Sequence, residues 1–163
     1  MKSIICLLLL WPFFASANPS GKFSIRTKLQ AVNSEWKHYD LPKDFVPANV
    51  HPTEKELIQM HLSLVEKNLR ARDVSHLSRN QILNRTNTLD ILHNYWNAGV
   101  FPKNTFHVQR TPYFIDIYGT YCAVGYLIKE TGFDAVAKKI NQENNFGYLR
   151  DLAAQYNEIN VWA

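Results

Sequence analysis

Two stretches of the chain carry apolar residues at helical spacing. Thr53, followed three residues later by Glu56, has the form of a capping box and marks the start of the first stretch. The apolar positions of this stretch then recur every three or four residues: Ile58, Leu62, Val65 and Leu69. We therefore expect a helix with one apolar face from Pro52 to Ala71.

The second stretch of helical spacing follows after a short link. Ser78 can cap its start, Gly99 can end it, and Pro102 lies just beyond. Its apolar residues fall near one face: Ile82, Leu89, Leu92 and Trp96. This pattern predicts a second long helix.

The last third of the chain predicts shorter elements. Residues 111–117 are rich in β-branched and aromatic types, which favour an extended segment, and Gly119-Thr120 should turn the chain into a helix from Tyr121 to Thr131. Gly132 would close that helix, and Asp134 can cap the next one. A final helix is supported by four residues: Leu149, Leu152, Ala153 and Tyr156.

The N-terminal stretch 18–50 has a different pattern. Apolar and polar residues alternate from Phe23 to Ala31, which predicts a half-buried strand. From Trp36 to Val50, aromatic residues mix with Pro42 and Pro47, which favours an irregular segment. We expect residues 18–50 to be irregular or partly extended and residues 51–163 to be helical.

The first 17 residues resemble a secretory signal peptide. Lys2 supplies a positive start, Ile4 to Phe14 is apolar but too short to cross a bilayer, and Ala15-Ser16-Ala17 has the form of a cleavage site. We expect the mature protein to begin at Asn18, to be secreted or periplasmic, and to keep no integral membrane segment.

Composition narrows the fold class and the partners. The chain has 163 residues, 46% of them hydrophobic, and a formal net charge of +4. These values suit a single compact domain, and with the patterns above they predict a mainly α fold of four to five helices with a short extended segment before the Gly119-Thr120 turn. The small positive excess favours solubility, and nucleic-acid binding is not expected.

The densest cluster of reactive side chains lies between His107 and Leu127. Cys6 leaves with the signal peptide, so Cys122 is the one thiol of the mature chain. With Thr120 as N-cap, Cys122 would lie in the first turn of a helix, where the helix dipole lowers a thiol pKa. A nucleophile then needs a base, His107 or His93, which Asp116 could orient.

A structural interpretation explains the same residues. Cys122 begins a run of small residues suited to close packing, and free cysteines are usually buried, so we favour a buried thiol. Arg110 and Asp116 could pair to brace the turn. Some aromatic residues of this region could instead line a binding groove. The candidate ligand-binding residues are Arg110, Tyr113, Asp116 and Tyr118.

Other chemistries lack their motifs. The six histidines show no paired zinc spacing, and there is no glycine-rich phosphate loop and no Gly-x-Ser-x-Gly element. We therefore expect no metal and no cofactor.

The segments R-T-P-Y-F-I-D and G-T-Y-C-A-V-G-Y-L-I, with H-L-S-L-V-E-K-N-L-R and Y-W-N-A-G-V-F-P upstream, resemble a family of uncharacterised exported bacterial proteins. The resemblance covers roughly His51 to Ala163, and its most specific block runs from Arg110 to Leu127. It implies a bacterial exported domain and no catalytic role for any residue. Two hypotheses follow: a non-catalytic module that binds an unknown protein or small-molecule ligand, or a cysteine-dependent hydrolase or transferase that uses Cys122.

Overall fold

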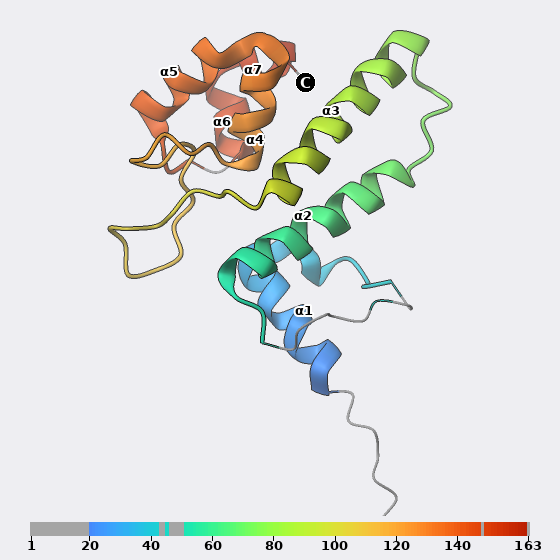
Figure 1. The fold of residues 1–163 in the computed structure, drawn as a ribbon. Coiled ribbons are helices and arrows are strands. Elements are labelled where there is room, and N and C mark those ends of the chain that lie inside the picture. Colours follow the sequence, from blue (N-terminus) through green and yellow to red (C-terminus); the bar gives the residue numbers. More distant parts are fainter. Residues whose placement is uncertain (1–19, 43–44, 46–50, 148, 163) are drawn as a thin grey trace, which may run out of the picture. The chain divides into compact units, whose positions relative to one another are not determined.

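The computed structural model describes residues 20–42, 45, 51–147 and 149–162, and within them the expected mainly α class is confirmed (Figure 1). The chain divides into two compact units, Met1–Val50 and His51–Ala163. The signal peptide expected over residues 1–17 lies outside the described residues and stays a prediction.

The first unit contains a helix where the sequence predicted a strand. Helix α1 spans Ser20–Val32, so the strand expected from Phe23 to Ala31 is wrong. Ile25 and Leu29 are fully buried, whereas Thr27 is exposed. A strand would place all three on the same face, but a helix places only residues three and four apart together. The two buried residues, Ile25 and Leu29, therefore fit a strand as well as a helix, and only the exposed Thr27 distinguishes them.

A short 3₁₀ helix, η1, follows at Ser34–Lys37 and packs against α1. The side chain of Asn33 caps it by accepting a hydrogen bond of 2.9 Å from the backbone N–H of Glu35, and Trp36 is buried. The irregular segment expected from Trp36 to Val50 starts after this helix, and its residues 43–44 and 46–50 lie outside the described residues.

The second unit begins with a helical hairpin. Helix α2 spans Glu54–Arg70 and helix α3 spans Arg79–Ala98, and Figure 1 shows the two side by side. Both predicted starts are confirmed, because Thr53 and Ser78 each form a complete capping box. Helix α3 ends at Gly99, whose φ of 64° lies in the left-handed region that glycine adopts without strain.

The hairpin is closed by apolar contacts between its helices. Buried residues from both helices form one cluster, called here the hairpin cluster: Leu62, Leu89, Leu92 and Tyr95. At its open end, the Gln59 side chain donates a hydrogen bond of 3.0 Å to the carbonyl oxygen of Trp96. This contact satisfies one of the last carbonyl groups of α3.

Short helices form the C-terminal part of the second unit. Their bounds are α4 at Ala123–Ile128, the π-helical turn η2 at Lys129–Phe133, α5 at Asp134–Asn144, α6 at Leu149–Gln155 and α7 at Asn157–Trp162. Gly132, with a φ of 95°, forms the kink between α4 and α5. Asp134 lies in the first turn of α5 and not at the N-cap where the sequence placed it, which is Phe133. Its carboxylate accepts a hydrogen bond from the hydroxyl of Tyr121.

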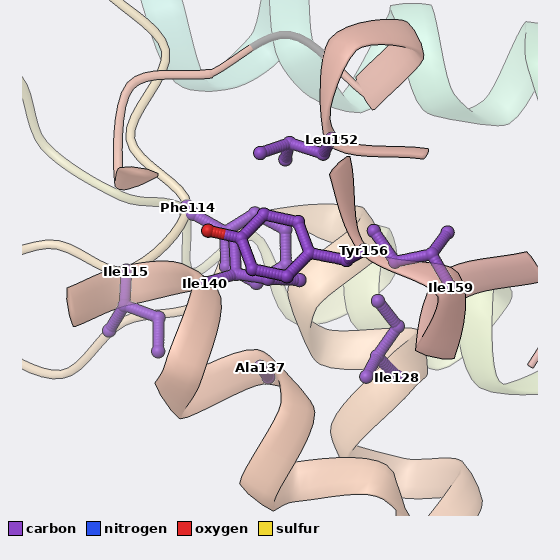
Figure 2. Packing of buried hydrophobic residues seen from close by; sticks show 8 residues of the cluster. All are labelled: Phe114, Ile115, Ile128, Ala137, Ile140, Leu152, Tyr156 and Ile159. Carbon is purple, nitrogen blue, oxygen red and sulfur yellow. The ribbon is translucent and has the colours of Figure 1, made fainter. Parts of the chain in front are cut away.

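A second buried cluster, the C-terminal cluster, holds these helices together (Figure 2). It contains Phe114, Ile115, Ile128, Ala137, Ile140, Leu152, Tyr156 and Ile159. The expected extended segment is present as a single antiparallel bridge between Ile115 and Tyr121. Asn145 fixes that segment to α5, because its side chain exchanges two hydrogen bonds of 2.9 Å with the backbone of Ile115.

Candidate functional site

Asp116 shapes the loop that contains most of the sequence-predicted site residues. It is buried, and its carboxylate accepts hydrogen bonds of 2.8–2.9 Å from the backbone N–H groups of Lys103, Tyr118 and Thr120. Burial raises the pKa of Asp116, but these hydrogen bonds outweigh burial and hold the pKa below its ordinary value. Asp116 is therefore an ionised group that organises the backbone.

His107 belongs to an aromatic cluster at the base of the same loop. Its Nδ1 atom lies 2.7 Å from the hydroxyl oxygen of Tyr113, which is buried. The rings of His107, Tyr113 and Phe146 meet edge to face with centroids 5.0–5.6 Å apart. These contacts hold the loop against the end of α5 and leave the imidazole paired with a phenol.

Arg110 binds an acidic residue far away in the sequence. Its guanidinium forms an ion pair with Glu54 in the first turn of α2. The pairing of Arg110 with Asp116 that the sequence suggested is thus wrong, because Asp116 is already satisfied by backbone donors. The ion pair ties the loop to the start of the hairpin.

Cys122 is a packed N-cap residue. It precedes α4 as its N-cap, a position predicted for Thr120, and its Sγ atom accepts a hydrogen bond of 3.4 Å from the backbone N–H of Gly125. The side chain packs against the C-terminal cluster. Burial raises the pKa of the thiol more than the N–H contacts lower it. The thiol is consequently protonated at neutral pH.

The structure does not assemble the catalytic group that the sequence suggested. Among the described residues, the Cys122 thiol accepts from the backbone N–H of Gly125, and the His107 ring pairs with the hydroxyl of Tyr113. Asp116 accepts from three backbone N–H groups and from the side chain of Thr120. His93 is held by Glu66. Neither histidine is therefore placed to take a proton from the thiol.

Bulky apolar side chains point outward from the loop that Asp116 organises. We call this set the loop surface; it consists of Phe106, Val108, Ile117 and Tyr118. Phe106 is 71% exposed, Tyr118 is 66% exposed and Val108 is fully exposed. The Lys103 ammonium lies 5.7 Å from the centre of the Tyr118 ring. Tyr118 was a predicted binding residue, whereas Phe106 and Val108 were not. The sequence does not show which apolar side chains of a loop are exposed to solvent.

A concave region lies between α2 and α3. This depression, the hairpin pocket, has a volume of about 540 Å³ and is lined by Ser63, Glu66, Lys67, Arg70, Ala71, His93 and Trp96. Helix α2 contributes residues three, four and seven positions apart, which share one face of a helix. The face of α3 that carries His93 and Trp96 completes the pocket.

Glu66 is the centre of the hairpin pocket. Its side chain is only 8% exposed, and its carboxylate accepts hydrogen bonds from Trp96 Nε1 at 2.6 Å, Arg70 Nε at 2.7 Å and His93 Nδ1 at 3.1 Å. Burial raises the pKa of Glu66, but these three donors outweigh burial, so its pKa lies below the ordinary value. An ionised carboxylate can only accept, so the Nδ1 atom of His93 carries a hydrogen.

The hairpin pocket lacks an activated nucleophile among the described residues. An imidazole that is oriented by a carboxylate, as His93 is by Glu66, can act as a general base. The hydroxyl that lines this pocket, Ser63 Oγ, donates instead to the carbonyl oxygen of Met60 at 3.0 Å. The geometry is therefore better suited to binding than to nucleophilic catalysis.

His93 was predicted from the sequence only as a base for Cys122, and the other residues of the pocket were not predicted as a site. Glu66 and Arg70 are four residues apart on a predicted helix, so their pairing was detectable. Their partners on α3 depend on how the two helices align, which local spacing does not determine.

Comparison with protein families, curated proteins and solved structures finds no match to this chain. The resemblance to exported bacterial proteins stays a prediction. Within the described ranges, no helix is long and apolar enough to cross a membrane. The same residues contain no group of His, Cys, Asp and Glu side chains placed to hold a metal ion.

Proposed function

We propose that the protein is an exported bacterial binding module without catalytic activity, which recognises a partner protein through the loop surface. The observation that carries this proposal is the outward display of Phe106, Val108 and Tyr118 on a loop with many internal contacts. Exposed bulky apolar side chains gathered on one segment are typical of interaction sites. None of them belongs to the hairpin cluster or to the C-terminal cluster.

The bracing of the loop supports binding because it reduces the entropy lost on association. The Asn104 side chain donates to the carbonyl of Gln109 at 2.7 Å and accepts from the N–H of His107 at 2.9 Å. Asp116 joins the two ends of the loop by accepting from Lys103 and Thr120, and the ion pair of Arg110 with Glu54 ties down its middle. A preorganised loop presents its apolar side chains with less ordering cost when a partner binds.

The environment of Cys122 also supports a binding function. A cysteine nucleophile acts as a thiolate, and desolvation of the partly buried Cys122 thiol raises its pKa. The groups that could have served as its base are held by Tyr113 and Glu66. Binding through the loop needs neither deprotonation nor movement of this residue.

Site-specific crosslinking tests the proposal. We would place p-benzoyl-phenylalanine at Val108, and as a matched control at Leu83, which is 59% exposed on α3. In extracts of the source cells, we expect position 108 to give one crosslinked adduct of defined mass. This adduct should disappear when the crosslinking protein also carries Phe106→Ser. Equal adducts from position 83, or no adduct from position 108, would overturn the proposal.

A further inference from the structure

The chemistry of the loop surface indicates which kind of partner segment it binds. We propose that the loop surface recognises an acidic segment of its partner, in which one carboxylate side chain lies between apolar side chains; this rests on the proposed function of the same surface. Three features support it: a fixed turn that displays Ile117 and Tyr118, a cation beside Tyr118, and the charges of the loop.

Ile117 and Tyr118 form the tip of a tight turn. The N–H of Gly119 donates to the carbonyl oxygen of Asp116 at 3.0 Å, and the N–H of Asp116 donates to that of Thr120 at 3.0 Å. Gly119 closes the turn with a φ of 76°, in the left-handed region. The backbone that displays the two exposed side chains is therefore already ordered, which lowers the entropy cost of binding.

Lys103 places a positive charge beside the ring of Tyr118. Its ammonium lies 5.7 Å from the ring centre, and its backbone N–H donates to the Asp116 carboxylate at 2.9 Å, which holds the Lys103 backbone next to the turn. In the part of the chain that the structure describes, no carboxylate forms an ion pair with this ammonium, and no group hydrogen-bonds the hydroxyl of Tyr118. An ammonium beside a phenol offers two donors to one incoming carboxylate.

The charges of the loop disfavour a second copy of this chain as the partner. Residues 99–121, all of which the structure describes, contain one acidic side chain, Asp116, and it is buried and hydrogen-bonded. Arg110 is already paired with Glu54. A second copy bound through the same surface would bring one Lys103 toward another and supply no carboxylate. Charge complementarity therefore favours a different protein with an acidic segment.

The same charges disfavour a lipid surface. Electrostatic binding to an anionic membrane uses clusters of several Lys and Arg side chains, whereas the loop surface has Lys103 as its one cation that forms no ion pair within the described residues. One cation suits one carboxylate. The exposed side chains of Phe106 and Val108 can cover the apolar neighbours of that carboxylate.

Titration by NMR on the full mature chain tests the proposal with three pentapeptides blocked at both ends. Their sequences are Ser-Leu-Glu-Leu-Ser, Ser-Leu-Gln-Leu-Ser and Ser-Leu-Lys-Leu-Ser, so they differ only in the charge of the central residue. The reporters are the backbone N–H signals of Tyr118 and Gly119. We expect a saturable shift with the Glu peptide and roughly fivefold weaker binding of the other two, as one exposed ion pair provides.

Three variants assign the preference to the loop surface. Lys103→Gln should remove the advantage of the Glu peptide over the Gln peptide, whereas Lys103→Arg should retain it. Arg79→Gln, in the first turn of α3, removes a charge outside the loop surface and should change nothing. The Lys103 side chain is exposed, so its variants should stay folded.

The outcomes against the proposal are distinct from failure of the proposed function, which crosslinking at position 108 decides. No shift with the Glu peptide, equal binding of the Glu and Gln peptides, or a preference that survives Lys103→Gln would overturn the acidic partner. Cosedimentation with phosphatidylglycerol vesicles that Phe106→Ser abolishes would assign the surface to a lipid, and a dimer that Tyr118→Ser dissociates would assign it to a second copy. Either result would overturn the proposal.

Discussion

At the residue scale, two buried carboxylates illustrate how their partners decide their roles. Asp116 and Glu66 are both buried and ionised, and both have a lowered pKa because hydrogen bonds outweigh burial. Asp116 accepts from three backbone N–H groups of one loop, so its charge determines the path of that loop. The donors of Glu66 are side chains of two helices, so its charge aligns α2 with α3 and shapes a pocket.

The thiol of Cys122 gives the first prediction at this scale. Because burial raises its pKa, we expect the native protein to react slowly with a thiol reagent such as dithiobis-nitrobenzoate and to react at once after denaturation. Cys122→Ala should keep the fold and cost about 1 kcal/mol of stability. Absorbance at 412 nm and denaturant midpoints measure the two effects.

Cys122→Asp provides the contrasting variant. It places an unpaired carboxylate against the C-terminal cluster, so it should lower stability far more than Cys122→Ala does. A stable Cys122→Asp protein, or native labelling as fast as that of the denatured chain, would contradict the packed position of this side chain.

At the element scale, the sequence predicted what local contacts determine. The starts of α2 and α3 were predicted correctly, because capping boxes involve residues only three positions apart. Helix α1 was mistaken for a strand, because Ile25 and Leu29 fit both a period of two and a helical turn. The partners of Glu66 were missed, because they come from a second helix whose alignment depends on packing.

The capping box of α2 gives the prediction at this scale. The Thr53 hydroxyl accepts from the N–H of Glu56, and the Glu56 carboxylate accepts from the N–H of Thr53 at 2.7 Å. Thr53→Ala removes one of these bonds and should lower the free energy of unfolding by about 1 kcal/mol. Thr53→Ser keeps the hydroxyl and serves as the control. Identical urea midpoints for the Ala and Ser variants would show that the cap adds no stability.

At the scale of the whole molecule, α4 connects the two buried clusters of the second unit. Tyr121, Cys122 and Val124 pack against the C-terminal cluster, whereas Tyr126 and Leu127 pack against the hairpin cluster. A helix that contacts apolar neighbours on both sides must be apolar all round. This explains why the residues around Cys122 carry no charge. The sequence alone was compatible with two interpretations of this segment, a packed helix start and a reactive thiol.

The small residues at the start of α4 follow from the same arrangement. A Cβ atom added at Gly125 would meet the ring of Phe114 at 3.1 Å and its carbonyl oxygen at 3.3 Å. The Cys122 N–H also donates to that carbonyl at 2.8 Å. Close approach of the extended segment to α4 therefore requires the run of small residues after Cys122, which the sequence suggested were suited to close packing.

The stability of the whole molecule should fall in mild acid because of His61. Burial lowers the pKa of His61 to about 4, whereas the unfolded chain binds the same proton near the reference value of about 6.5. Above that value neither state is protonated and the stability is complete. Between about pH 6.5 and 4 the unfolded state takes up a proton that the folded state refuses, so stability is lost, by at most about 3 kcal/mol.

Denaturant unfolding at pH 7 and at pH 4.5 measures this loss. The free energy of unfolding should differ less between the two pH values in His61→Gln than in the unchanged protein, because the variant lacks this titrating group. This comparison holds whatever the substitution does to stability at pH 7. His76→Gln, at an exposed position in the link between α2 and α3, should leave the difference unchanged. An unaltered pH difference in His61→Gln would mean that other groups cause the acid sensitivity, and that His61 takes up its proton as readily in the folded protein as in the unfolded chain.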